Sequence, residues 1–351
     1  GEGAKALGHG AFASLVGGII GVTILMFLGP FVAQGALLLH SPDRFSLILL
    51  ALVIVSVIGG GSIAKGIIAT MVGLMFATVG IDTMEPFARF HFGIPQLVAG
   101  VALIPAVIGI FAISELLVQA ETGWKGAVIT GKESRQKLRR RDFILKLSEL
   151  KEIGLRTYAK SALIGTAVGA LPGAGASMAA FMSYAEAKRA SKHPERFGTG
   201  LPQGIAAAET ANNAMCSGAI IPLLSLGIPG DAVTAMVFGV LLIQGMVPGP
   251  ELILDKFHII APMYAALMVA AILVFISLMI FGPYYIKIAS VNRAVLYSFI
   301  AMIAMVGVYA AAFSSFQMGV ALFTGIIAYF FRKQGYPTIP ILMGIILGPI
   351  A

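Results

Sequence analysis

The 351-residue sequence has little cysteine and little charge. Its one cysteine, Cys216, excludes a disulfide framework and a cysteine-based metal cluster, and we expect it to be a small core residue. Only 11% of the residues are charged and 58% are hydrophobic, which excludes a soluble globular domain. The formal charge of +8 does not indicate nucleic-acid binding, because the basic residues stand beside hydrophobic runs rather than in a separate polar domain.

Motifs for nucleotide hydrolysis and for side-chain catalysis are also missing. No glycine-rich phosphate loop ends in lysine, so ATP hydrolysis within this chain is not expected. The histidines are scattered, mostly in expected loops or near the ends of apolar runs: His9, His40, His91, His193 and His258. We therefore expect neither an enzyme nor a resident cofactor.

What the sequence has instead is a series of apolar runs of about 20 residues, long enough to cross a hydrocarbon core as helices. The runs are continuously apolar, as in 97–117, so we predict an all-α polytopic membrane protein. The expected spans are 11–39, broken at Gly29-Pro30, then 44–60, 65–81, 96–118, 258–282, 294–312 and 316–331, with a shorter run at 338–351.

Basic residues set the expected topology. Between 119 and 160, eleven Lys or Arg stand against five acids, so the positive-inside rule makes this loop cytoplasmic. The links near Lys5 and Lys65 then also lie inside, while 40–44 and 81–93 lie outside. The run 134–156 favours an interfacial amphipathic helix, and an RNA- or lipid-binding patch is the alternative.

A second basic cluster, 186–198, follows only about 25 apolar residues later, too few for two crossings of a ~30 Å core. If both clusters are cytoplasmic, the segment 161–185 enters and leaves by the same face. Its midpoint, Pro172-Gly173-Ala174-Gly175, predicts the tip of a re-entrant hairpin. A second break follows at Gly227-Ile228-Pro229-Gly230, inside the run 219–245, while 201–218 is partly unassigned.

Non-helical backbone at membrane depth persists only where it is buried in protein or lines a wet cavity. A new helix starts after each break, and helix N-termini suit carboxylate or phosphate. The alternatives are that the breaks are packed proline kinks and that Asp231 is simply an N-cap. The candidate substrate-binding residues are Pro172, Gly173, Ala174, Gly175, Ala176, Ser177, Gly227, Pro229, Gly230, Asp231 and Thr234.

The most polar stretch within the apolar runs is 206–218. Glu209, Asn212 and Asn213 lie at i, i+3 and i+4, on one helical face, and an ionisable residue in a membrane segment is functional by default. Their oxygens suit a small cation such as Na⁺, whereas Glu209 alone suits a proton. The alternatives are a hydrogen-bond network between helices, or an interfacial helix with Glu209 in solvent.

The segment 169–252 resembles the signature region of the large membrane subunit, the TctA type, of tripartite tricarboxylate transporters. The stretches 73–97 and 104–117 are similar to the same family. The resemblance implies a permease of the bacterial inner membrane that imports carboxylates by cation symport, with Na⁺ or H⁺ as coupling ion. It also implies two partners, a small membrane subunit and a periplasmic substrate-binding protein. Two inverted halves, each with a hairpin and a break, are implied as well, and by analogy an elevator-type movement.

Family members are longer, and the first half's hairpin and break are absent from these residues, so we expect the chain to be a fragment. We divide it into 1–118, transmembrane helices linking the halves; 119–160, the basic loop; 161–250, the transport core; and 251–351, C-terminal transmembrane helices. Two other functions stay open. One is a membrane-embedded enzyme using Glu209 as acid or base, and the other is a passive channel or scaffold subunit.

Overall fold

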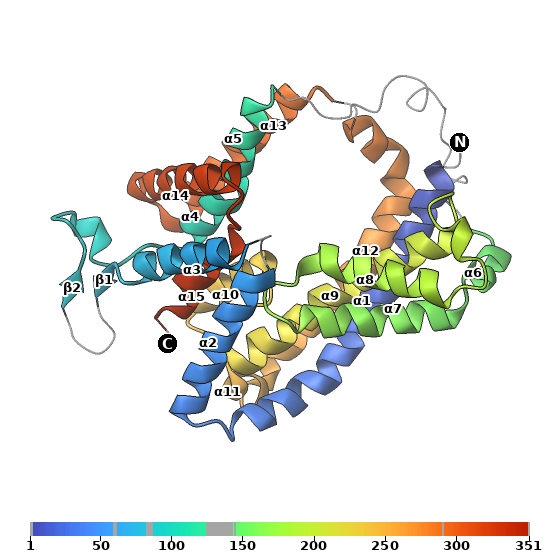
Figure 1. The fold of residues 1–351 in the computed structure, drawn as a ribbon, viewed down its shortest axis with the longest axis horizontal. Helices are drawn as coiled ribbons and strands as arrows, with labels where there is room; N and C mark the ends of the chain where they lie inside the picture. The colour runs from blue at the N-terminus through green and yellow to red at the C-terminus, as the bar shows by residue number, and fades with distance from the viewer. Residues whose placement is uncertain are drawn as a thin grey trace. The chain divides into compact units, whose positions relative to one another are not determined.

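The computed structural model describes residues 3–58, 62–81, 87–123, 143, 145–289 and 291–349, and they are mostly helical. They pack into two units that interleave along the chain (Figure 1). Unit 1 comprises Gly1–Leu38, Ala127–Gly230 and Val247–Ser290, and unit 2 comprises Leu39–Gly126, Asp231–Met246 and Val291–Ala351. These units are defined by packing, so the four consecutive segments expected from the sequence stay a prediction about roles in transport.

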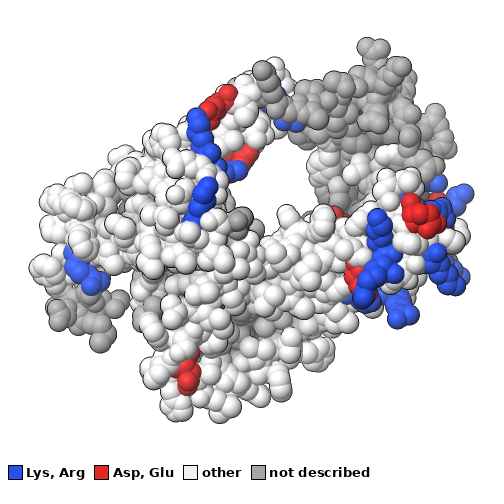
Figure 2. Space-filling view, in the orientation of Figure 1, with Lys and Arg blue, Asp and Glu red and all other residues white. Residues whose placement is uncertain are grey.

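Unit 1 is built around helix α9 (Pro202–Leu226), which packs against α1 (Gly3–Ala36), α7 (Leu155–Gly169) and α8 (Gly175–Ala190) (Figure 1). Short elements border it: α6 (Leu147–Ile153), the 3-10 turn η4 (Pro194–Arg196) and α11 (Pro250–Leu254). The long helix α12 (Phe257–Ala289) packs along α1. Lysine and arginine side chains of this unit gather at the end that carries α6 and the connection from α8 to α9 (Figure 2).

Unit 2 has two helical groups. In the first, α3 (Ile63–Ala77) packs against α2 (Ser41–Ile58) and α15 (Ile339–Leu347). In the second, α14 (Ser315–Lys333) packs along the nearly continuous helix formed by α4 (Leu103–Ile108), the π-helical turn η2 (Gly109–Ile113) and α5 (Ser114–Glu121). The remaining elements are α10 (Ala232–Ile243), α13 (Arg293–Ala312), the 3-10 turn η1 (Pro95–Leu97), and the antiparallel strands β1 (Gly80–Ile81) and β2 (Ala88–Arg89).

Six helices are long and apolar enough to span a membrane, counting only the described residues, which confirms an all-α polytopic membrane protein. Most expected spans match helices within a few residues. The expected break at Gly29-Pro30 is wrong, because α1 runs through Pro30 without interruption. Proline costs one backbone hydrogen bond inside a helix, and membrane helices tolerate it when neighbouring groups satisfy the freed carbonyl.

Two other expectations meet different outcomes. The segment 201–218, which the sequence pattern assigns only in part, is the first part of the single helix α9. The expected amphipathic helix at 134–156 lies largely outside the described residues, and its described end forms α6 and the start of α7.

Glycine allows the helices of unit 1 to approach each other closely. A Cβ at Gly17 or Gly21 of α1 would collide with the backbone of α9, at Thr210 and Ala214. On another side of α9, a Cβ at Gly165 or Gly169 of α7 would collide with the carbonyl oxygens of Ala211 and Met215. Both pairs follow the spacing of small residues that brings membrane helices into backbone contact. Glycine-lined faces of α1 and α7 therefore contact α9 closely on two sides.

Candidate functional site

The first sequence break is the turn of a helical hairpin. Helices α7 and α8 pack against each other, and Ala170 to Ala174 connect them. The turn is closed by the Leu171 N–H donating to Val168 O at 3.0 Å and by the Ala174 N–H donating to Leu171 O at 3.3 Å. Gly173 has a φ of 82° and Gly175 a φ of 66°, values that suit glycine and strain other residues. The Pro-Gly sequence therefore makes the tip of a helical hairpin, and its entry and exit by the same membrane face stays a prediction.

The second break ends α9. Gly227 adopts a left-handed conformation with a φ of 72°, and its N–H donates to Leu223 O at 3.0 Å. The next amide, of Ile228, donates back to Pro222 O at 3.2 Å, a glycine-terminated helix end that satisfies carbonyls which would otherwise lack partners. All four residues from Gly227 to Gly230 are buried.

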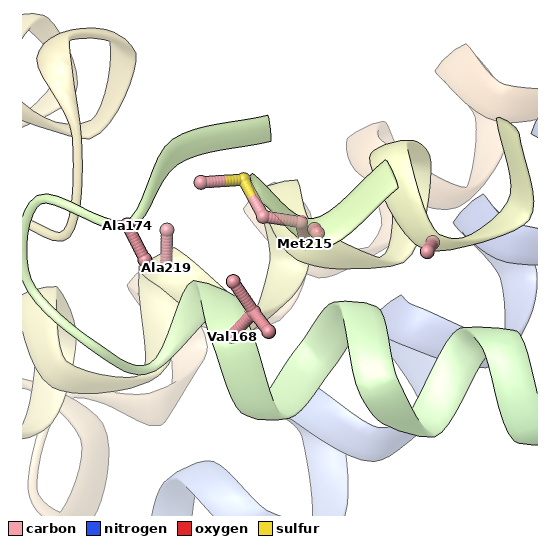
Figure 3. Close-up of a cluster of buried hydrophobic side chains, with 6 residues drawn as sticks. Val168, Ala174, Met215 and Ala219 are labelled. Carbon is pink, nitrogen blue, oxygen red and sulfur yellow. The ribbon is translucent and has the colours of Figure 1, made fainter. Parts of the chain in front are cut away.

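The two breaks are joined by a hydrogen bond. The Gly173 N–H at the hairpin tip donates to the Gly230 carbonyl oxygen at 2.7 Å. Gly230 allows this approach because a Cβ there would lie 2.8 Å from Gly169 O and 2.9 Å from the Ala219 Cβ. Below the tip, Ala174 points toward Met215 and Ala219 of α9, with Val168 of α7 beside them (Figure 3). Residues far apart in the sequence thus form one packed junction.

The helix that starts at the tip has no capping side chain. The N-cap position of α8 is Ala174, whose side chain offers no acceptor. Gly175 and Ala176 are half-buried, and Ser177, in the first turn, is exposed. Because the first amides of a helix lack partners within the helix and carry partial positive charge, this end suits an anionic group.

The helix that follows the second break is capped by its own residues. Asp231 is the N-cap of α10, and its Oδ1 accepts the Thr234 N–H at 2.8 Å. Thr234 Oγ1 in turn accepts the Asp231 N–H at 2.9 Å, which completes a capping box. The N-cap alternative for Asp231 is therefore realised, and its carboxylate already uses one donor that a substrate carboxylate would need.

The predicted polar face of α9 takes part in a hydrogen-bond network with α1. Ser14 Oγ of α1 donates to Glu209 Oε1 at 2.9 Å, and Asn213 Nδ2 donates to Ser14 Oγ at 2.9 Å and to Glu209 Oε1 at 3.3 Å. Beside it, Thr210 Oγ1 donates to Ala13 O at 3.3 Å. Glu209 and Asn213 are half-buried, as is Ser14. Within the described residues, no cationic side chain forms an ion pair with Glu209.

Asn212 and Cys216 complete this stretch of α9. Asn212 is half-buried, and its backbone carbonyl accepts the Cys216 thiol at 3.7 Å. The Cys216 side chain is exposed, so the expectation of a core residue is wrong. A thiol behaves as a small hydrophobic group, and an outer surface that faces apolar surroundings accommodates it as well as a core does. The described residues contain no group of three His, Cys, Asp or Glu that could hold a metal ion.

Ser14 and the junction between Gly173 and Gly230 are the features that sequence reasoning missed. A single serine among the small and apolar residues of α1 carries no motif, and its only signal is a hydroxyl inside a long apolar run. The junction joins segments more than fifty residues apart, so no local pattern reveals it.

Comparisons with known proteins assign the chain to a group of transporters. A family model described as "Tripartite tricarboxylate transporter TctA family" matches residues 1–343. The chain is 30% identical over 354 residues to an uncharacterized 52.8 kDa protein in the TAR-I ttuC' 3' region of Agrobacterium vitis, covering 100% of this chain and 68% of that protein. It is 35% identical over 190 residues to an uncharacterized protein in the TAR-II ttuC' 3' region of the same organism, covering 53% and 77%. No solved structure matches the chain.

Proposed function

This chain belongs to the tripartite tricarboxylate transporter TctA family, and we propose from that premise that it is the large permease subunit of a cation-driven carboxylate uptake system. It works in the bacterial inner membrane with a small membrane subunit and a periplasmic substrate-binding protein. The substrate is a citrate-type carboxylate, and the coupling cation is Na⁺ or H⁺.

The substrate site proposed here is centred on the hairpin tip. The observation that carries it is the uncapped start of α8 beside the hydrogen bond between Gly173 and Gly230. The amides of Gly175 to Ser177 and the exposed Ser177 hydroxyl supply donors for a carboxylate. The buried residues Gly227, Pro229 and Gly230 hold the tip in place rather than contact the ligand.

Asp231 and Thr234 have a supporting part in this proposal. Their capping box fixes the start of α10, and an ionised Asp231 repels a carboxylate ligand at close range. They therefore position the break and do not contribute ligand-binding donors.

Cation coupling is assigned to Glu209, assisted by Asn213 and by Ser14 of α1, with Asn212 on the same helical face. A half-buried carboxylate inside an apolar helix, held by neutral donors, responds strongly to a bound proton or cation because no fixed positive charge compensates it. Since its hydrogen bonds run between α1 and α9, a change of charge at Glu209 alters the link between two packed helices. The gradient therefore acts on the helix that supports the hairpin tip.

The test is carboxylate uptake into membrane vesicles that carry the complete transporter and its binding protein. Gly230→Ala places a Cβ 2.8 Å from Gly169 O, so we expect it to displace the tip and reduce uptake strongly. Gly249→Ala is the matched control, because nothing lies within 4 Å of a Cβ there, and it is expected to keep uptake. Pro172→Ala and Ser177→Ala probe the tip itself and are expected to raise KM.

Two results would argue against this proposal. Uptake that survives both Gly230→Ala and Pro172→Ala removes the tip from the substrate site. Uptake that is passive and unaffected when the ion gradients are collapsed identifies a channel instead of a coupled permease.

A further inference from the structure

A cavity of about 710 Å³ lies in unit 1, away from the hairpin tip, at the opposite end of α7 and α8. Its walls come from the start of α1, from α6, from the connection between α8 and α9, and from the first turn of α9. This volume falls within the range of small-molecule sites, roughly 300–1,000 Å³. By the charge pattern of the sequence, this end of the unit faces the cytoplasm.

The first turn of α9 opens into this cavity without a cap. Leu201, Pro202 and Gln203 line the cavity, and Leu201, the N-cap residue, offers no side-chain acceptor. Pro202 has no N–H, and the Gly204 N–H donates to Leu201 O at 3.1 Å, which leaves the Gln203 amide as the first-turn donor without a cap. The 25-residue helix places the positive end of its dipole here.

A second, independent feature points to a ligand in the same place. His9 lines the cavity, its side chain is only 3% exposed, and its Nδ1 has no hydrogen-bond partner among the described residues. A buried polar atom without a partner costs free energy, so such atoms are rare unless something binds them. The first turn of α9 and His9, whose Nδ1 lacks a partner, thus line one cavity.

Charge at the rim favours an anion. Lys192 and Arg196 line the cavity with exposed side chains. Two acids are also in the lining. Glu149 already accepts the Lys5 ammonium at 3.0 Å and the Lys146 N–H at 2.9 Å, and Glu152 has an exposed side chain on α6. His193, the remaining titratable group of the lining, lies 3.4 Å from Glu195.

We propose that this cavity is a binding site for a small oxyanion with more than one negative charge, separate from the transport site at the hairpin tip. The Gln203 amide and His9 Nδ1 hold the anion inside, and Lys192 and Arg196 hold it from the rim. Carboxylates and phosphates share this chemistry, so the ligand is either a dissolved di- or tricarboxylate or a phosphate compound.

The experiment measures the thermal stability of the purified full transporter chain while inorganic phosphate or citrate is titrated. We expect a saturable increase in Tm, with an apparent affinity that falls at least about tenfold in the double variant Lys192→Gln/Arg196→Gln. His9→Gln is expected to weaken the same binding. Both substituted cations are exposed, so loss of folding does not explain their effect.

Arg189→Gln is the matched control, because Arg189 is likewise exposed, in the last turn of α8, but does not line the cavity and donates to Glu186 at 2.8 Å. It is expected to keep the affinity. Binding of phosphate assigns the site to phosphate compounds, and binding of citrate alone assigns it to carboxylates.

The proposal is overturned if the double variant binds both anions like the wild type, or if Arg189→Gln weakens binding as much. It is also overturned if His9→Gln leaves the affinity unchanged, since binding is then confined to the rim. Uptake assays of the hairpin variants do not enter this measurement, so either proposal fails without the other.

Discussion

In unit 2 the acidic residues Glu115 and Glu121 lie near a helix end, and each pairs with a cation of α14. Arg332 bonds to Glu115, and Lys333 bonds to Glu121, which also accepts the Tyr329 hydroxyl at 2.7 Å. In unit 1, by contrast, Glu209 lies in the interior of α9 and accepts hydrogen bonds only from the neutral groups of Ser14 and Asn213 among the described contacts. A carboxylate that is already neutralised by a paired cation binds a further cation weakly, whereas a carboxylate without a cationic partner binds one more strongly.

Neutralising one carboxylate of each kind is the strongest test of this difference between paired and unpaired carboxylates. We expect Glu209→Gln to abolish gradient-driven uptake, because it removes the charge that we propose responds to the coupling ion while keeping shape and hydrogen bonds. Glu115→Gln is expected to retain uptake and to lower stability by about 1 kcal/mol, since its ion pair is partly exposed. Vesicle uptake with and without an imposed gradient measures the first effect, and thermal unfolding measures the second.

Exchange of labelled for unlabelled substrate adds a control, because it needs no net ion movement. Retained exchange in Glu209→Gln separates a coupling defect from misfolding. If uptake in Glu209→Gln stays at the wild-type level, the two kinds of carboxylate do not differ in function.

A second prediction concerns helix packing, in which the two units are alike. A Cβ at Gly218 of α9 would collide with Thr166 O, and one at Gly109 of unit 2 would collide with Ala321 O. We expect Gly218→Ala and Gly109→Ala each to destabilise the protein by about 1–3 kcal/mol or more, because backbone has to move. Gly307→Ala, with nothing within 4 Å, is expected to stabilise α13 by up to ~1 kcal/mol. Thermal unfolding of the three variants measures this, and equal stability of all three would contradict it.

The sequence predicted the elements of unit 1 better than their meeting points. The hairpin could be predicted from the sequence because two basic clusters flank an apolar segment too short to cross the membrane twice. The break at 227–230 could be predicted because Gly-Ile-Pro-Gly ends a helix by local chemistry. The contact between Gly173 and Gly230 could not be predicted, since it depends on how the chain folds back through α9, which lies between them in the sequence. Ser14 was missed because a hydroxyl becomes part of a site only through its neighbour on another helix.

The wrong expectations have a common physical origin. A break at Pro30 was inferred from the residue alone, but the cost of proline in a helix depends on its neighbours, and α1 absorbs it. Burial of Cys216 was inferred from residue type, although the outer surface of a membrane protein is itself apolar. Substrate contact by Asp231 and Thr234, by contrast, stays a prediction, because a capping box and a substrate contact require the same residue types.

The smallest expected effect concerns ion pairs at the basic end of unit 1. The backbone N–H of Lys146, and after it the Lys5 ammonium, hold the pKa of Glu149 below its ordinary value of 4.5. A lowered pKa in the folded chain gives stability that is complete above pH 4.5 and is lost as the pH falls through the lowered pKa. Glu149→Gln is expected to remove this part of the acid dependence of Tm, and Lys5→Gln to remove a smaller part. An acid dependence identical in wild type and Glu149→Gln would contradict the assignment.

The close glycine contacts between α9 and its neighbouring helices limit which substitutions this protein can accept over evolutionary time. At Gly165 and Gly169 of α7, and at Gly218 of α9 itself, the atom that blocks a Cβ is a backbone carbonyl oxygen, which every amino acid carries. No second substitution on the facing helix relieves that obstacle, because changing a side chain leaves the oxygen where it is. A substitution of glycine at these positions therefore has no local compensating change. Either the substitution reverts to glycine or the two helices move apart.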